Sequence, residues 1–189
     1  YPAQLWNPVW MSPLSPCELK DVFETPLSPE QLYSEAIALW DSSGVSSNLG
    51  RSLEFYTHYY LPDNILAKAD RATMMSSLES RSIFLDNDLI DFCQQLPQSF
   101  KYRRGQKKYI LKKTLSGLLP DEIIGRKKKG FGMPIGKWLM SYPHKPPLSP
   151  ISGMNMRSVE RSWEQHRAGK VNNRLFLWAY MALQSAHYE

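Results

Sequence analysis

The sequence predicts an all-α, irregular helical domain. Apolar residues recur at helical spacing in several stretches, and capping residues and prolines stand where helices would begin or end. Hardly any segment alternates as a β-strand does, residues 99–102 being at most a short extended piece. With 189 residues, 42% of them hydrophobic, the chain is long enough to bury a core. We therefore expect a single helical region over residues 1–189.

The first elements follow a turn-rich opening with four prolines. Ser28-Pro29-Glu30-Gln31 is a capping box with proline at the first helical position, which predicts a helix over residues 29–41. Gly44 and its neighbouring serines break the pattern, and a second amphipathic helix is expected over residues 49–60.

A third helix is predicted to begin at Tyr60-Leu61-Pro62-Asp63, with proline in its first turn, and to run to about Leu78. At 100° per residue its apolar positions form one stripe, which we expect to face the core. The opposite face carries charge and, if the helix persists to residue 79, a glutamate. The apolar positions are Ile65, Leu66, Ala69, Ala72 and Thr73, and the opposite face holds Lys68, Arg71, Met75 and Glu79.

Later elements are predicted from similar signals. Asp86 is expected to cap a helix over residues 89–96, which Pro97 ends. Further helices are expected over residues 106–118, just after Pro120, and over residues 136–140, 158–167 and 173–187. We expect Cys93 to be a small buried hydrophobe. The residues expected to form the core are Leu66, Leu78, Phe84, Leu85, Phe92, Leu111, Leu115 and Leu119.

Composition excludes several classes of protein. The two cysteines have no CxxC spacing and the four histidines are scattered, so neither a disulfide framework nor a metal site is expected. Because no long apolar run or signal peptide is present, we expect a cytoplasmic protein without a membrane partner. The sequence contains no GxGxxG, GxxxxGK[ST], GxSxG or HExxH motif.

Positive charge gathers in one part of the chain. The formal net charge is +5, but residues 101–129 hold eleven Lys or Arg against two acidic residues. A basic loop, Arg126 to Phe131, begins within this run, and Gly130 and Gly132 follow its lysines. Such a run could be a solvated loop or a nucleic-acid patch. The glycines favour a shaped turn instead, and glycine amides beside lysines fit pyrophosphate, so we expect no nucleic-acid partner.

A second charged group combines Lys68 and Arg71 with Glu79-x-Arg81 and Asp86. The simplest interpretation is that Glu79 and Arg81 pair at a helix end, worth about 0 to 1 kcal/mol if exposed. The alternative is that they line the wall of a site.

Five ordered blocks spanning about 75 residues resemble the asparagine synthase family, in the C-terminal part of its ATP-using synthetase domain. The family patterns are YLPDDIL, DRxxM, ExRxPFLD and RxKxGFGxP. One departure is Ser82-Ile83, where the family has proline before Phe-Leu-Asp. The matching blocks here are Tyr60 to Leu66, Asp70 to Met74, Leu78 to Arg81, Phe84 to Asp86, and Arg126 to Phe131 with Pro134-Ile135.

The resemblance implies an enzyme that activates a carboxylate, aspartate's in the type member, as an acyl-adenylate with ATP and Mg²⁺. Ammonia from glutamine then attacks to form the amide. By resemblance, Lys128 stabilises charge on the departing pyrophosphate and Glu79 orients the ammonia or the substrate. Arg71 and Arg81 would keep Glu79 ionised. The remaining implied residues are Lys68 and Arg126 near the phosphates or substrate, and Asp70, Asp86, Gly130 and Phe131 in structural roles.

The family's glutaminase domain and its SGGxDS pyrophosphate loop are absent from these 189 residues. We therefore expect an all-α portion of an α/β ATP-pyrophosphatase-type domain, inactive by itself, that binds ATP and Mg²⁺ weakly and has the missing N-terminal portion as its partner. The first residue, Tyr1, is not methionine, which favours a fragment. An oligomer is possible. Alternatives are an amidotransferase of surface-polysaccharide biosynthesis acting on a sugar acid, or a stand-alone helical binding module.

Overall fold

The structure is a computed structural model that describes residues 1–25, 27–127, 130, 132–142 and 148–186. The chain divides into two compact units, which we describe separately. The first unit combines Tyr1–Arg51 with Gly132–Glu189, and the second is Ser52–Phe131. In the part of the chain that is described, helices dominate and the one sheet has two short strands, so the predicted all-α class is confirmed.

The first unit begins with short helices. Ser15 and Ser28 each form a capping box, with Glu18 and Gln31 respectively, as the sequence predicts for the second of them. The helix predicted over residues 29–41 is interrupted at Tyr33, so that two helices replace one. The helices of this unit are η1 (Ala3–Leu5), α1 (Trp6–Met11), α2 (Pro16–Val22), α3 (Pro29–Leu32), α4 (Ser34–Ser42), α11 (Ile135–Ser141), α12 (Met156–Arg167) and α13 (Arg174–Ala186).

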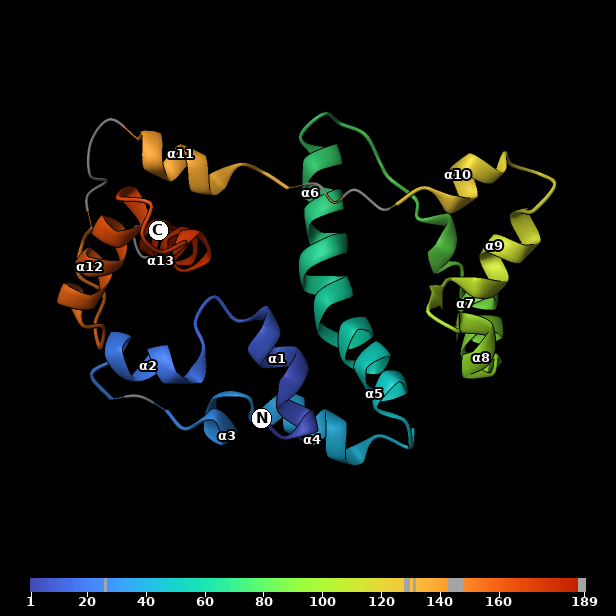
Figure 1. Cartoon of the computed structure of the whole chain (residues 1–189), viewed down its shortest axis with the longest axis horizontal. Coiled ribbons are helices and arrows are strands. Elements are labelled where there is room, and N and C mark those ends of the chain that lie inside the picture. The colour runs from blue at the N-terminus through green and yellow to red at the C-terminus, as the bar shows by residue number, and fades with distance from the viewer. Residues whose placement is uncertain (26, 128–129, 131, 143–147, 187–189) are drawn as a thin grey trace. The chain divides into compact units, whose positions relative to one another are not determined.

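A hydrophobic core joins the two ends of the chain within the first unit. Helix α12 packs against α2, α11 and α13 (Figure 1). Backbone hydrogen bonds from Asn155 N–H to Val22 O (2.7 Å) and from Glu24 N–H to Gly153 O (2.9 Å) fasten α2 to the segment before α12. The buried residues of this core are Val22, Leu139, Met154, Val159, Trp163, Phe176, Leu177 and Tyr180.

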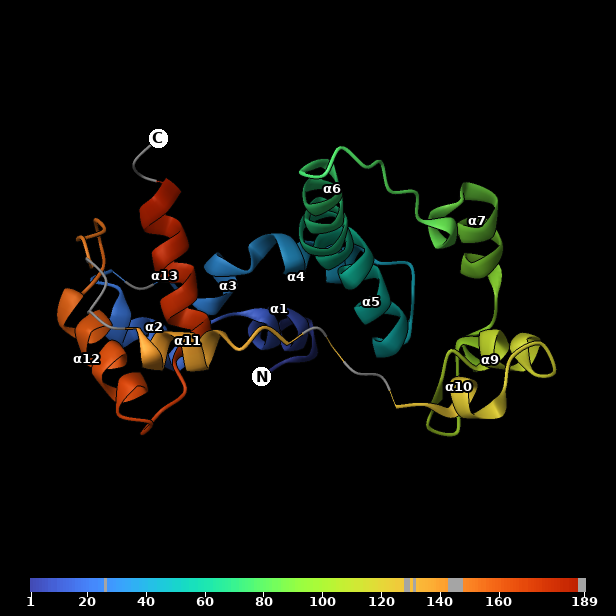
Figure 2. The same ribbon diagram turned by 90° about the horizontal axis from the view of Figure 1, so that it is seen from above.

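A long helical run links the units and continues into the second one. It consists of α5 (Asn48–Phe55), the π-helix η2 (Tyr56–Leu66) and α6 (Ala67–Met74), which follow one another without a break (Figure 2). The prediction that a new helix begins at Tyr60 is therefore wrong, because Pro62 lies inside the π-helix. A π-turn is wider than an α-turn, which relieves the clash of a proline ring with the preceding turn.

The rest of the second unit is made of short elements. Asp86 caps α7 as predicted, and Pro97 follows its end. The helix predicted over residues 106–118 is shorter, because a hairpin occupies its first positions. These elements are η3 (Ile83–Leu85), α7 (Asn87–Gln95), α8 (Gln98–Lys101), β1 (Tyr102–Arg103), β2 (Gln106–Lys107), α9 (Tyr109–Leu115) and α10 (Asp121–Gly125).

The predicted core residues are not buried, and that prediction is wrong. All eight belong to the second unit, where Phe55 is the only described residue that is buried. Leu78 is 62% exposed and Phe84 67%. Cys93, predicted to be buried, is exposed as well. The apolar spacing identified faces fit for burial, but packing within the second unit, such as that of α8 against α9, leaves these residues half-buried or exposed.

Candidate functional site

The predicted charged face of α6 is only partly formed. Lys68, Asp70 and Arg71 are exposed on this helix. The helix ends at Met74, and Ser77 has a left-handed backbone with φ of 56°. The chain therefore leaves the helix axis before residue 79. Glu79 does not share a helical face with Lys68 and Arg71, which corrects the extended-helix prediction.

Glu79 and Arg81 form an ion pair. The Arg81 Nη2 atom lies 2.6 Å from Glu79 Oε1, and the side chains are 68% exposed for Glu79 and 87% for Arg81. Within the described residues, neither Lys68 nor Arg71 pairs with Glu79. An exposed pair of this kind stabilises a fold by about 0 to 1 kcal/mol. The pair thus contributes little to the stability of the fold. Its carboxylate and guanidinium are accessible from solvent.

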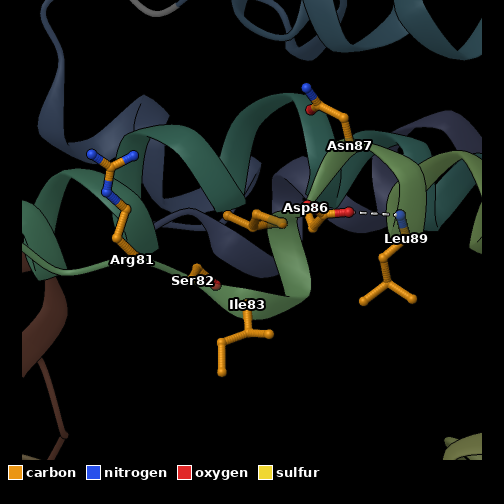
Figure 3. Close-up of a pocket in the computed structure, with 7 residues that line it drawn as sticks. Arg81, Ser82, Ile83, Asp86, Asn87 and Leu89 are labelled. Atoms are coloured by element: carbon orange, nitrogen blue, oxygen red, sulfur yellow. Dashed lines mark hydrogen bonds between the residues drawn. The ribbon is translucent and has the colours of Figure 1, made fainter.

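The segment after Arg81 forms an open hollow of about 620 Å³. Figure 3 shows Ile83 and Leu89 pointing to one side of the chain there, and Arg81 and Asn87 pointing to the other. The Asp86 carboxylate accepts a hydrogen bond from Leu89 N–H at 3.2 Å, which caps α7. Asp86 therefore fixes the start of α7, which lies at this hollow. Arg81 is the cation on its rim.

The departure at Ser82-Ile83 falls within the same hollow. Ser82 has an extended backbone and precedes the short helix η3, which Ile83 begins. The Ile83 side chain is 83% exposed. A proline at this position would fix φ near −65°; isoleucine instead adds an apolar side chain to the hollow's surface.

The basic loop begins directly after α10. Arg126 is the C-cap of that helix, and both Arg126 and Lys127 are exposed. Gly130 is exposed too, and nothing lies within 4 Å of the place where a Cβ would stand. The predicted Lys128 and Phe131 lie outside the described residues. The described end of the loop, Arg126 with Lys127, offers two accessible cations, which suits an anionic ligand.

Described residues do not gather into a metal site. No group of three or more His, Cys, Asp or Glu side chains in the described ranges could hold a metal ion. Nor is any helix in the described ranges long and apolar enough to cross a membrane.

One buried polar residue, His166, was not predicted, because the four histidines are scattered along the sequence. His166 is 3% exposed and lies between helices of the first unit, with both ring nitrogens in hydrogen bonds. A signal was present: Val159, Trp163 and His166 follow the i, i+4, i+7 spacing of a buried helical stripe.

Comparison with known proteins identifies the family that this chain resembles. A family model described as asparagine synthase matches residues 5–188. The match covers the α6 residues, the Glu79–Arg81 pair, the hollow and the basic loop. No solved structure matches the chain.

Several curated relatives are named as asparagine synthetases. The chain is 32% identical to asparagine synthetase [glutamine-hydrolyzing] 1 of Bacillus subtilis over 136 residues, which is 69% of this chain and 22% of that protein. It is 31% identical to a putative asparagine synthetase of Mycobacterium bovis over 135 residues, 68% of this chain and 21% of that protein. A more distant relative is amidase chyE of Penicillium rubens, 27% identical over 55% of this chain and 16% of that protein. The chain therefore spans about a fifth of the length of the curated relatives.

Proposed function

We propose, because this chain belongs to the asparagine synthase family, that it is part of an ATP-dependent amidotransferase that converts a carboxylate into an amide. The match over residues 5–188 is the observation that carries this proposal. The overall reaction would convert aspartate, glutamine, ATP and water into asparagine, glutamate, AMP and pyrophosphate, through an acyl-adenylate. Glutamine-hydrolysing asparagine synthetases among the relatives support aspartate as the substrate.

Each chemical need of this reaction has a candidate group in the chain. Pyrophosphate departure requires a cation where negative charge builds up, and the basic loop supplies Lys128, with Arg126 nearby in sequence. Amide formation requires a group that accepts or places a proton of the attacking ammonia, and Glu79 is the candidate. Arg81 Nη2 lies 2.6 Å from Glu79 Oε1, which places a cation beside the carboxylate proposed for this role.

The exposed position of the Glu79–Arg81 pair supports its assignment as the wall of a site. A pair serving mainly to hold the fold would be expected between packed elements, whereas these side chains are 68% and 87% exposed. Lys68 and Arg71 add positive charge on α6, a helix that is separate from this segment, and we propose them for the substrate or phosphate environment. Asp70, Asp86, Gly130 and Phe131 are proposed to have structural roles, of which the Asp86 cap is the observed example.

ATP and Mg²⁺ would be held mostly by protein outside this chain. The 189 residues contain no SGGxDS loop, and the described residues hold no cluster suited to a metal ion. Bound Mg²⁺ would neutralise phosphate charge. We therefore propose that the rest of the protein, including a glutaminase domain, is the partner of this chain, and that the chain by itself is inactive and binds ATP weakly.

The test is to supply the complete protein with ATP and glutamine and to vary the carboxylate. We expect aspartate to give equal amounts of pyrophosphate and asparagine. Release of pyrophosphate with a sugar acid but not with aspartate would support the polysaccharide alternative, for which the Ser82-Ile83 departure in the hollow is the favouring observation. No pyrophosphate with any carboxylate would overturn the ligase proposal and favour a binding module.

A further inference from the structure

We propose that the β1–β2 hairpin, with α8 and α9 beside it, forms a surface that binds single-stranded nucleic acid. This inference goes beyond the proposed function and does not rest on it. The expectation of no nucleic-acid partner rested on the glycines of the basic loop, which lie outside the hairpin. Residues 92–120 contain no acidic residue. The seven cations among them, called the hairpin cations below, are Lys101, Arg103, Arg104, Lys107, Lys108, Lys112 and Lys113.

The hairpin cations gather in space as well as in sequence. Strand β1 pairs with β2, and α8 contacts both β1 and α9. Five of the seven residues are exposed. Among the described residues, none of the seven forms an ion pair with an acidic side chain. Like charges that lie close together without acidic partners repel one another, so the arrangement favours an anionic ligand.

Two of the hairpin cations have a backbone conformation that costs energy. The φ angle is 47° at Arg104 and 56° at Lys108, both in the left-handed region. Glycine and asparagine occupy this region at lower cost than arginine or lysine. Residues held in this way cluster at functional sites, including those that bind ligands. The stability of the hairpin therefore does not explain why cations occupy these two positions, and a role in binding an anion would explain it.

The Arg103 side chain is oriented by a tyrosine. Its Nη1 atom donates a hydrogen bond to Tyr109 Oη at 3.0 Å, and its Cζ atom lies 5.1 Å from the centre of the Tyr109 ring. A guanidinium has five N–H donors, so one bond to a hydroxyl leaves others for a phosphate. Arg103 is thus an exposed cation that is already ordered before a ligand binds.

The distribution of charge around the hairpin favours a flexible strand over a membrane. Directly opposite residues of an antiparallel pair share a face, so Lys107 lies with Tyr102 on one face and Arg103 lies with Gln106 on the other. Arg104 is in the turn between the strands. A flat lipid surface can meet only one of these faces, whereas a single strand can follow the cations around the hairpin.

Exposed aromatic rings among the cations favour a ligand that carries bases. Phe100 is 41% exposed and Tyr102 is 44% exposed. Proteins that bind single strands combine a basic surface with aromatic rings on which the bases stack. A duplex fits less well, because its bases already stack on one another. Each strand of the hairpin also has only two residues, which is too short to fill a major groove.

The experiment measures binding of the complete protein to a fluorescently labelled single-stranded DNA of about 12 nucleotides by anisotropy. Arg104→Gln combined with Lys107→Gln should weaken binding by roughly tenfold. It should also lower the dependence of log K on log salt by about 0.7 for each cation removed. Tyr102→Leu should weaken binding by roughly fivefold or more, because it removes a ring on which a base stacks.

The matched control combines Lys20→Gln with Lys170→Gln, which removes the same charge from exposed positions of the first unit. We expect it to leave the affinity and its salt dependence nearly unchanged. All variants should have melting temperatures similar to that of the wild type. The labelled DNA is also annealed to its complement, and vesicles of phosphatidylserine and phosphatidylcholine are tested in parallel.

Three results would overturn the inference. Equal weakening by the two double variants would show that only net charge matters. Equal affinity for the duplex, or unchanged affinity in Tyr102→Leu, would show that no base stacks on the hairpin. A protein that binds no DNA, or binds only the vesicles, would show that the surface does not serve nucleic acid. Aspartate-dependent pyrophosphate release is a separate measurement, so none of these results bears on the proposed function.

Discussion

At the scale of single residues, exposure distinguishes the groups proposed for the site from groups that hold the fold. Glu79 and Arg81 lie close together in solvent, where their attraction is worth about 0 to 1 kcal/mol. Tyr180, in contrast, is 1% exposed and donates its hydroxyl hydrogen to Ser149 O. Substitutions at these two places should therefore change different properties of the protein.

Replacing Glu79 with glutamine removes a charge and keeps the size of the side chain. If the carboxylate accepts or places a proton of the ammonia, Glu79→Gln in the complete protein should slow amide formation about a hundredfold, or about 2.7 kcal/mol. The melting temperature should hardly change, because the side chain is 68% exposed. Glu24→Gln, at an exposed glutamate of the first unit, is the control. Equal activity of the two variants would show that Glu79 has no catalytic role and only forms a surface ion pair with Arg81.

The Tyr180 hydroxyl predicts how stability depends on pH. Burial raises the pKa of Tyr180 above its ordinary value of 10.0. The neutral form is favoured in the folded protein, so its contribution to stability is complete below pH 10.0 and is lost as the pH rises from there through the folded pKa. Urea unfolding above about pH 10 should show this loss in the wild type and less of it in Tyr180→Phe.

Tyr142→Phe is the matched control for that titration, because Tyr142 is 47% exposed. Its unfolding should keep the wild-type pH dependence. If Tyr180→Phe also keeps it, Tyr180 is not the residue that titrates.

At the scale of elements, the β1–β2 hairpin shows a conformation that its sequence does not favour. Its two-residue loop is Arg104-Gly105, with φ of 47° and 83°. Two positive φ values make a type I′ turn, in which Asn-Gly is the preferred pair. Arginine at the first position therefore holds a left-handed backbone at some cost.

Arg104→Asn should relieve that strain. We expect the hairpin to gain about 0.5 to 1 kcal/mol, which would slow hydrogen exchange of the amides in Tyr102–Lys107 by roughly twofold to fivefold. Lys107→Asn removes the same charge from a strand position and should not slow the exchange. Equal effects from both variants would mean that charge, and not backbone conformation, limits the hairpin.

Elements with local signals were predictable from the sequence, and those fixed by their surroundings were not. The Ser28 capping box and the Asp86 cap are confirmed because each depends on residues three positions apart. The passage of a helix through Pro62 was missed, because proline usually marks a helix start or end. The Arg104-Gly105 turn was missed because arginine is not a typical residue there.

The site was predictable to a similar degree. Glu79 and Arg81 were expected to be near one another, and they form an ion pair. The predicted shared face of Glu79 with Lys68 and Arg71 depended on the helix reaching residue 79, whereas the left-handed Ser77 follows its end. The spacing of Val159, Trp163 and His166 marks a buried stripe, but the hydrogen-bond partners of His166, Gly136 and Asn173, could not be predicted from it.

At the scale of the whole molecule, the two units differ in how much they bury. The first unit has a hydrophobic core built from both ends of the chain. The second has Phe55 as its only buried described residue and leaves large apolar side chains in solvent, including Leu78, Ile83 and Phe92. Exposed apolar surface of this extent is typical of a face that another part of a protein covers.

Hydrogen exchange tests whether the rest of the protein covers the second unit. Amides of α7 and α9 should exchange rapidly in the 189-residue chain and at least roughly a hundredfold more slowly in the complete protein, because burial of the apolar faces adds stability to that unit. Amides of α12 and α13, in the first unit, should change much less. Equal protection of α7 and α9 in both proteins would support a stand-alone module.

The most direct test of the account is alanine substitution of the three adjacent lysines in the complete protein, with aspartate-dependent pyrophosphate release as the measurement. If Lys128 stabilises the departing pyrophosphate, Lys128→Ala should lower the rate by about a hundredfold or more, equivalent to about 2.7 kcal/mol. Lys127→Ala and Lys129→Ala should each lower it by less than about fivefold. Lys128→Arg should recover little, since a planar guanidinium does not replace a compact ammonium. Glutamine hydrolysis should be unchanged throughout. Three alanine variants with the same rate would contradict the account and leave the loop as a solvated basic turn.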